Sequence, residues 1–436
     1  MRRYIVVVLL AAAMVVGAGV ALGGPSTPGP TTASGADPAA LGRVNSDRLD
    51  DAIAALQTHL RTQPKDARSW ATLGVAYVEQ ARLTGDPTYY PKAEGVLRRS
   101  MQEQAQDNEA ALTGMAALDA ARHDFAAALS WTDKSLAINP TNAQTLAVRT
   151  DALVELGRYD AAQRAATRAD NIAPGIPTFT RLSYLAELHG DLAEAERLLR
   201  LARRSARIPS DVAFVRVLLG DLARRQGRLD AADDHYAAAL AARSTDVPAL
   251  VGRSRVASAE GNLERATTLL TEAVTRLPAP EYLIALGELY QARGDQEQAA
   301  EQYAVVRGAA RLAAANGVST DLELAIFEAD HGDPAAALRS ARAEWARRHS
   351  IHAADALGWA LHASGRDREA LRYARSATRL GTKDARLLFH RGMIEAALGR
   401  DAQASRTLRD ALAADPHFSP LHAPVARRTL GTIDRS

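Results

Sequence analysis

The sequence predicts an all-α solenoid of about ten stacked helical hairpins. Three observations lead to this fold class: a recurring glycine–alanine pair, a spacing of 33 to 38 residues between successive pairs, and a composition that is 47% hydrophobic but 5% aromatic. This composition suits close-packed helices and disfavours β-sheet. The alanine follows the glycine by five residues in eight pairs, which are Gly157/Ala162, Gly190/Ala195, Gly227/Ala232, Gly261/Ala266, Gly294/Ala299, Gly332/Ala337, Gly365/Ala370 and Gly399/Ala404.

Each glycine–alanine pair has a direct structural interpretation. The glycine ends the first helix of a hairpin, because the left-handed conformation at that point costs glycine no steric energy. The alanine lies where the second helix approaches the first most closely, so that leucine would overpack the crossing by about 1–3 kcal/mol. The same register adds Ala128, with His123 in the glycine position, and Ala52, which predicts a lone opening helix from Ser46 to Pro64.

These hairpins resemble tetratricopeptide repeats, whose first helix carries Leu-Gly and Tyr and whose second carries Ala and an aromatic residue. One unit matches with Trp70, Leu73, Gly74 and Tyr77, and another with Leu286, Gly287, Tyr290, Gly294, Ala299 and Tyr303. The resemblance covers residues 46–418 and implies a right-handed superhelix with a concave groove. Residues 419–436 are expected to cap the last hairpin.

Extra residues interrupt the period at three places. They lie between residues 85 and 91, before Val212 and before Val318. Insertions in solenoids usually emerge as loops on one edge, so we expect loops at these positions.

Residues 1–24 are predicted to be an export segment. Arg2 and Arg3 precede an uncharged run of 19 residues, from Tyr4 to Leu22, which is near the length that spans a bilayer. Because small residues near Gly23 also suit signal peptidase, a retained membrane anchor and a cleaved signal peptide both stay open. Residues 25–45 are rich in Pro, Gly, Ser and Thr and are expected to be a disordered linker. The remainder should be extracytoplasmic, either anchored to the cell membrane or secreted.

The sequence carries no recognisable catalytic constellation. It has no cysteine, no nucleophile elbow, no phosphate-binding loop and no paired-histidine zinc motif, so we expect no enzyme, cofactor or metal. Its 53 basic and 51 acidic residues are too balanced to favour nucleic acid as the main partner. An enzyme subunit and an RNA-binding helical array are therefore the less favoured alternatives.

The best candidate for partner recognition is the helix that starts at Ile351. In tetratricopeptide-like hairpins, positions 2, 5, 9 and 12 of the first helix line the groove, which the resemblance assigns here to His352, Asp355, Trp359 and His362. These positions share one helical face, and tryptophan often dominates binding energy. In the alternative interpretation, Trp359 belongs to the core and the histidines are partly solvated.

Other conspicuous residues have structural explanations. His189 and His331 precede hairpin glycines, where histidine interacts with the free carbonyls of a helix end. A local basic concentration would suit anionic lipid or an acidic polymer, although interspersed acids favour a solvated face. It consists of Arg203, Arg204, Arg207, Arg224, Arg225 and Arg228.

We therefore expect an exported, non-catalytic scaffold that binds a protein or peptide partner in its concave groove. An assembly factor or chaperone for a secreted or membrane complex of the cell envelope is the main alternative.

Overall fold

The computed structural model describes residues 46–435, in which 22 α-helices and no strands are found. The predicted export segment (1–24) and linker (25–45) lie outside the described residues. Twenty of the helices form ten consecutive hairpins, α3/α4 (Ala67–Thr84, Tyr89–Glu103), α5/α6 (Glu109–Ala121, Phe125–Ile138), α7/α8 (Ala143–Glu155, Tyr159–Ile172), α9/α10 (Ile176–Leu188, Leu192–Ser205), α11/α12 (Pro209–Arg225, Leu229–Ala242), α13/α14 (Val247–Ala259, Leu263–Arg276), α15/α16 (Pro280–Arg293, Gln296–Ala315), α17/α18 (Asp321–His331, Pro334–Arg347), α19/α20 (Ile351–Ala363, Asp367–Ala377) and α21/α22 (Ala385–Ala397, Asp401–Ala414).

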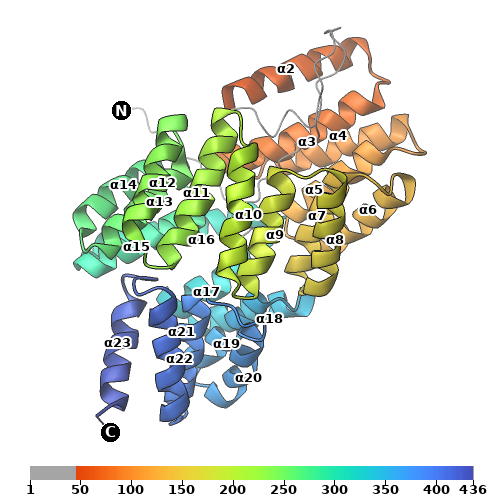
Figure 1. Cartoon of the computed structure of the whole chain (residues 1–436). Helices are drawn as coiled ribbons and strands as arrows, with labels where there is room; N and C mark the ends of the chain where they lie inside the picture. The colour runs from red at the N-terminus through yellow and green to blue at the C-terminus, as the bar shows by residue number, and fades with distance from the viewer. Residues whose placement is uncertain (1–45, 436) are drawn as a thin grey trace.

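The array opens with the single helix α2 (Ser46–Thr62) and closes with the single helix α23 (His422–Ile433). Helix α23 packs against α21 and α22, where its buried residues Ala423, Ala426 and Leu430 cover the last hairpin. The predicted all-α solenoid of about ten hairpins is thereby confirmed (Figure 1). Within residues 46–435, no helix combines the length and the apolar character that crossing a bilayer requires.

The hairpin turns adopt the predicted left-handed backbone in seven of the eight glycine–alanine pairs, with φ between 66° and 91°. These seven glycines are Gly157, Gly190, Gly227, Gly261, Gly294, Gly365 and Gly399. His123 occupies the equivalent position with φ of 63°, which confirms that it replaces a glycine. Gly332 is the exception: its φ is −146°, so the left-handed prediction is wrong there. A Cβ at Gly332 would lie 1.7 Å from Oε2 of Glu328, so the glycine provides space for that carboxylate instead.

The eight alanines of the pairs confirm the predicted close crossing of the two helices. Each lies in the second helix of its hairpin and is at most 1% exposed, and Ala128 is also fully buried. Because each alanine is buried in a packed hairpin, a larger side chain at these points would overpack the crossing of the two helices. None of the eight lines either cavity described below. They are Ala162, Ala195, Ala232, Ala266, Ala299, Ala337, Ala370 and Ala404.

Two of the three expected edge loops are absent, because the extra residues extend helices. The extra length before Val318 makes α16 the longest helix described, with 20 residues. The extra length before Val212 lies in α11, which begins at Pro209. Between α3 and α4 a linker of residues 85–88 is present, and Gly85 at its start has φ of 70°.

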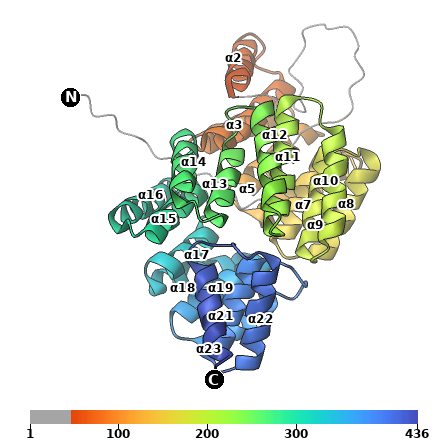
Figure 2. The same cartoon turned by 60° about the vertical axis from the view of Figure 1, so that its left-hand side comes forward.

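The superhelix returns to contact itself, so that α17–α23 lie against the turns of the earlier hairpins (Figures 1 and 2). We call this contact the seam. It joins the turns after α5, α7, α9 and α11 to the linkers before α17, α19, α21 and α23. The Tyr159 hydroxyl accepts a hydrogen bond from the Ile351 N–H at 2.8 Å across 192 residues of chain. Arg224 pairs with Asp415 at 2.8 Å across 191 residues.

A buried ionic cluster stands at the centre of the seam. The Arg348 guanidinium donates to Glu155 from α7 and to Glu344 from α18, and all three side chains are buried. The same guanidinium lies 4.8 Å from the ring centroid of Phe125. Burial raises the pKa of Glu155, although Arg348 and His123 favour its charged form. Arg348 therefore links Glu155 to Glu344 across the seam, and Arg347 also pairs with Glu344.

Candidate binding cavity on the concave face

A cavity of about 360 Å³ lies on the inner side of the superhelix, next to the seam. Most of its wall comes from the first helices of the hairpins, namely α11, α13, α15, α17, α19 and α21, and the linker after α22 completes it. The wall combines apolar and charged side chains. The apolar part includes Ile284, Leu289, Leu322, Ile326, Phe327 and Phe418.

His352 and Asp355 both line this cavity, as two of the four predicted groove residues. The Asp355 carboxylate binds Nδ1 of His390 at 2.9 and 3.0 Å, and both of these side chains are buried. Nε2 of His352 lies 3.1 Å from the hydroxyl of Tyr184, whereas its Nδ1 is buried without a hydrogen-bond partner. Burial lowers the pKa of His352, which favours the neutral ring.

Trp359 and His362 lie outside the residues that line the cavity. Trp359 is 8% exposed and donates its indole N–H to Asp330 at 2.7 Å. Its ring stacks on His390, with 4.1 Å between the ring centroids and 11° between the planes. Nδ1 of His362 is 2.5 Å from a carboxylate oxygen of Asp367. Trp359 is therefore a core residue, as in the alternative interpretation. That His352, Asp355, Trp359 and His362 bind a partner directly stays a prediction.

Most charged groups of the cavity wall have partners. Nε2 of His331 lies 3.3 Å from Glu288, and Asp330 accepts the indole N–H of Trp359. Burial opposes the charged form of Asp384, but Arg386 and other neighbours lower its pKa overall. Glu323 differs, because both of its carboxylate oxygens are buried and accept no hydrogen bond. A buried carboxylate without a donor is costly, so this group is the conspicuous unsatisfied charge of the cavity.

The sequence indicates only part of this wall. In the hairpin that precedes Ile351, the same groove register gives Leu322 and Ile326, which correspond to Asp355 and Trp359 and which both line the cavity. Glu323 lies one residue beyond this register, so no helical pattern in the sequence indicates it.

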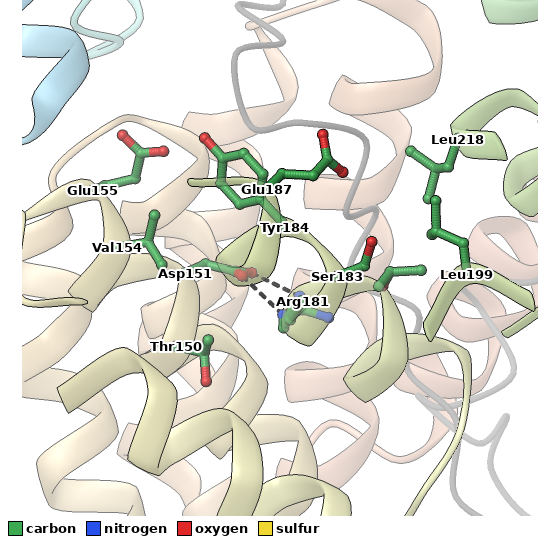
Figure 3. A pocket seen from close by; sticks show the side chains of 11 residues that line it. Thr150, Asp151, Val154, Glu155, Arg181, Ser183, Tyr184, Glu187, Leu199 and Leu218 are labelled. Carbon is green, nitrogen blue, oxygen red and sulfur yellow. Dashed lines mark hydrogen bonds and ion pairs between the residues drawn. The ribbon is translucent and has the colours of Figure 1, made fainter. Parts of the chain in front are cut away.

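A second, smaller cavity of about 30 Å³ lies between α7, α9 and their neighbours (Figure 3). Arg181 binds Asp151 through two contacts of 2.8 and 2.6 Å, and Glu155, Tyr184 and Glu187 lie to one side of this pair (Figure 3). Burial raises the pKa values of Asp151 and Glu187 despite their arginine partners, and it raises that of Tyr184 strongly. Through the Tyr184–His352 contact, this wall is connected to the larger cavity.

The two histidines that precede hairpin glycines behave differently. Nδ1 of His189 bonds to the carbonyl of Leu185 at 2.8 Å, which confirms the predicted contact with its own helix end. His331 lies in the last turn of α17, as predicted, but its ring stacks on Tyr303, with 4.6 Å between ring centroids, and contacts Glu288 of another helix. Among the described residues, no three His, Cys, Asp or Glu side chains are placed to hold a metal ion.

Ten stacked hairpins around an inner cavity define a repeat protein of the α-solenoid class. The hairpin turns, the buried alanines and the matches to the repeat pattern make this solenoid similar to tetratricopeptide-repeat proteins.

Comparisons with known proteins give partial similarities. No family model matches the chain. It is 30% identical over 111 residues to cellulose synthase 1 operon protein C of Komagataeibacter xylinus, a stretch covering 26% of this chain and 8% of that protein. A thermophilic TPR protein of Thermus thermophilus is 25% identical with a TM-score of 0.35, covering 40% of this chain and 91% of that chain. A human IFIT1 dimer with PPP-AAAA is 15% identical with a TM-score of 0.45, covering 86% of this chain and 89% of that chain.

Proposed function

We propose that this protein is a non-catalytic scaffold that binds a peptide segment of another protein in the concave cavity. The observation that carries the proposal is the unsatisfied Glu323 beside apolar side chains such as Ile326 and Phe327. Peptide grooves commonly combine apolar contacts, which supply affinity, with a few polar groups that set specificity.

The chemistry of the cavity specifies the kind of segment. A lysine or arginine side chain would donate hydrogen bonds to the buried Glu323 carboxylate and neutralise it. Neighbouring apolar side chains of the same segment would cover Ile284, Ile326 and Phe418. We therefore propose a partner segment that places one basic residue among apolar ones.

The substitution Glu323→Gln should change peptide affinity and folding stability in opposite directions. Loss of the buried charge, which accepts no hydrogen bond, should stabilise the unbound protein by about 1 kcal/mol, because glutamine is less costly to bury. The same change should weaken binding of basic–apolar peptides selected from a random display library by about ten-fold or more, as loss of a charge-assisted hydrogen bond implies. Thermal unfolding and isothermal titration calorimetry measure the two effects.

Glu301→Gln is the matched control, because Glu301 is an exposed residue of α16 outside the cavity. It should change neither quantity. If the selected peptides contained no excess of basic residues, or if they bound Glu323→Gln as tightly as the wild type, the proposed recognition would be wrong.

We further propose that the scaffold acts outside the cytoplasm, at the cell membrane or secreted. The two arginines and the uncharged run between Tyr4 and Leu22 support this proposal. Fractionation of the native cells, followed by N-terminal sequencing, tests it. A full-length protein in the cytoplasmic fraction would contradict export, whereas a start after residue 24 would identify a cleaved signal.

A further inference from the structure

The basic concentration that the sequence shows in residues 203–228 consists of two structurally different groups. In the first group, each arginine has an acidic partner: Arg224 pairs with Asp415, Arg225 with Glu187 and Arg228 with Glu196. In the second group, Arg203, Arg204 and Arg207 take part in none of the ion pairs found among the described residues. Arg216 on the next helix joins this second group, because it too lacks an acidic partner there.

Three cationic or potentially cationic side chains lie on the consecutive helices α10, α11 and α12. Arg203 comes from α10, Arg216 from α11 and His235 from α12. Nη1 of Arg216 lies 3.0 Å from Nδ1 of His235. Because a guanidinium can only donate, Nδ1 must accept, and the proton of the neutral ring is on Nε2. His235 therefore also presents a donor to its surroundings.

The two arginines are incompletely satisfied. The Nε atoms of Arg203 and Arg216 are both buried and have no hydrogen-bond partner. Burial, together with the nearby Arg203, lowers the pKa of Arg216. Burial, Arg216 and Arg228 lower the pKa of His235, while Asp234 and Glu196 act weakly in the opposite direction. Since Glu196 is already paired with Arg200 and Arg228, the positive charge at this point is not neutralised within the described residues.

We propose that Arg203, Arg216 and His235 form a binding site for a phosphate-type oxyanion, carried either by free phosphate or by a lipid headgroup. Arg203 and Arg216 come from adjacent helices and each keeps a buried Nε without a hydrogen-bond partner. An oxyanion would accept hydrogen bonds from guanidinium groups and neutralise their charge. None of the three residues lines either cavity of the concave face, so this site is separate from the proposed peptide site.

The test titrates inorganic phosphate into the full chain at constant ionic strength, with chloride as the balancing anion. Wild type should bind phosphate saturably in isothermal titration calorimetry, and its melting temperature should rise with phosphate but not with chloride. Arg216→Gln and Arg203→Gln should each weaken phosphate binding at least ten-fold. Arg200→Gln is the control, because Arg200 is exposed and paired with Glu196, and it should bind phosphate as the wild type does.

A second arm separates the two sources of the oxyanion. The full chain is sedimented with phosphatidylcholine vesicles that do or do not contain phosphatidic acid. Binding to the phosphatidic acid vesicles that Arg216→Gln abolishes assigns the site to a headgroup, and binding of inorganic phosphate without vesicle binding assigns it to free phosphate. The proposal is overturned if wild type binds neither probe saturably, or if Arg216→Gln and Arg203→Gln, with normal melting temperatures, bind both as tightly as wild type.

Discussion

Replacing Arg348 with alanine should lower the free energy of unfolding by about 3–5 kcal/mol, the usual cost of removing one partner from a buried ion pair. The side chain is 5% exposed and donates to both Glu155 and Glu344. In the variant, Glu155 stays buried without an arginine partner, whereas Glu344 keeps only its contact with Arg347. Because Glu155 is on α7 and Arg348 directly precedes α19, the loss should also loosen the contact between the two turns of the superhelix.

The loss should depend on pH in a defined direction. Burial already raises the pKa of Glu155 above that of an exposed glutamate, and removal of Arg348 should raise it further. A raised carboxyl pKa in the folded state lowers stability as the pH rises through it. The difference between wild type and Arg348→Ala should therefore be largest near neutral pH and shrink as the pH falls. Urea unfolding at several pH values measures it.

Arg347→Ala is the matched control for this experiment. Arg347 is the neighbouring arginine and also contacts Glu344, but its side chain is 42% exposed. Exposed ion pairs contribute about 0–1 kcal/mol, so this variant should lose far less stability. Equal losses for the two variants would show that Arg348 does not hold a buried contact.

Alanine at Gly157 or Gly190 should cost about 2–5 kcal/mol, which is the second large effect expected. Both glycines have a left-handed backbone, with φ of 74° and 76°, where a Cβ costs about 1–2 kcal/mol. Each also abuts the seam: an added Cβ would lie 2.5 Å from the carbonyl oxygen of His349 or Gly381. Relieving this overlap requires the backbone of the opposite turn to move, which adds overpacking of about 1–3 kcal/mol.

Gly261 and Gly365 provide the comparison, because their backbones are left-handed but an added Cβ would meet nothing within 4 Å. Their alanine variants should lose about 1–2 kcal/mol, from the backbone alone. Thermal and urea unfolding of the four variants measure the difference. If Gly157→Ala and Gly190→Ala behaved like Gly261→Ala and Gly365→Ala, the account of the seam would be wrong.

The local features of the fold are predictable from the sequence because they repeat. A glycine followed five residues later by an alanine, as in Gly157 and Ala162, occurs eight times. This repetition also identifies His123 as a residue that occupies a glycine position. Features that occur only once in the chain cannot be predicted from the repeat pattern. The extension of α16 adds residues that suit a helix as well as a loop, and Gly332 makes room for a Glu328 carboxylate that no pattern indicates.

The seam and the site are harder to predict for a different physical reason. Contacts such as Tyr159 with Ile351 depend on the pitch of the superhelix, which accumulates from small rotations between hairpins over 192 residues. The helical register places His352 and Asp355 on one face of α19, and both line the cavity. It cannot place Trp359, because that ring is enclosed by His390 and Asp330 from neighbouring hairpins.

The central claim is that the two turns of the superhelix bind each other and so shape the inner cavity. A double-mutant cycle with Glu155→Gln and Arg348→Met tests it most directly, because these residues are 193 positions apart in the chain. If they are in contact, the effects of the two substitutions on the free energy of unfolding should be non-additive by about 1.5–3 kcal/mol. Additive effects, within about 0.5 kcal/mol, would show that the two turns do not meet at this point and would contradict the account.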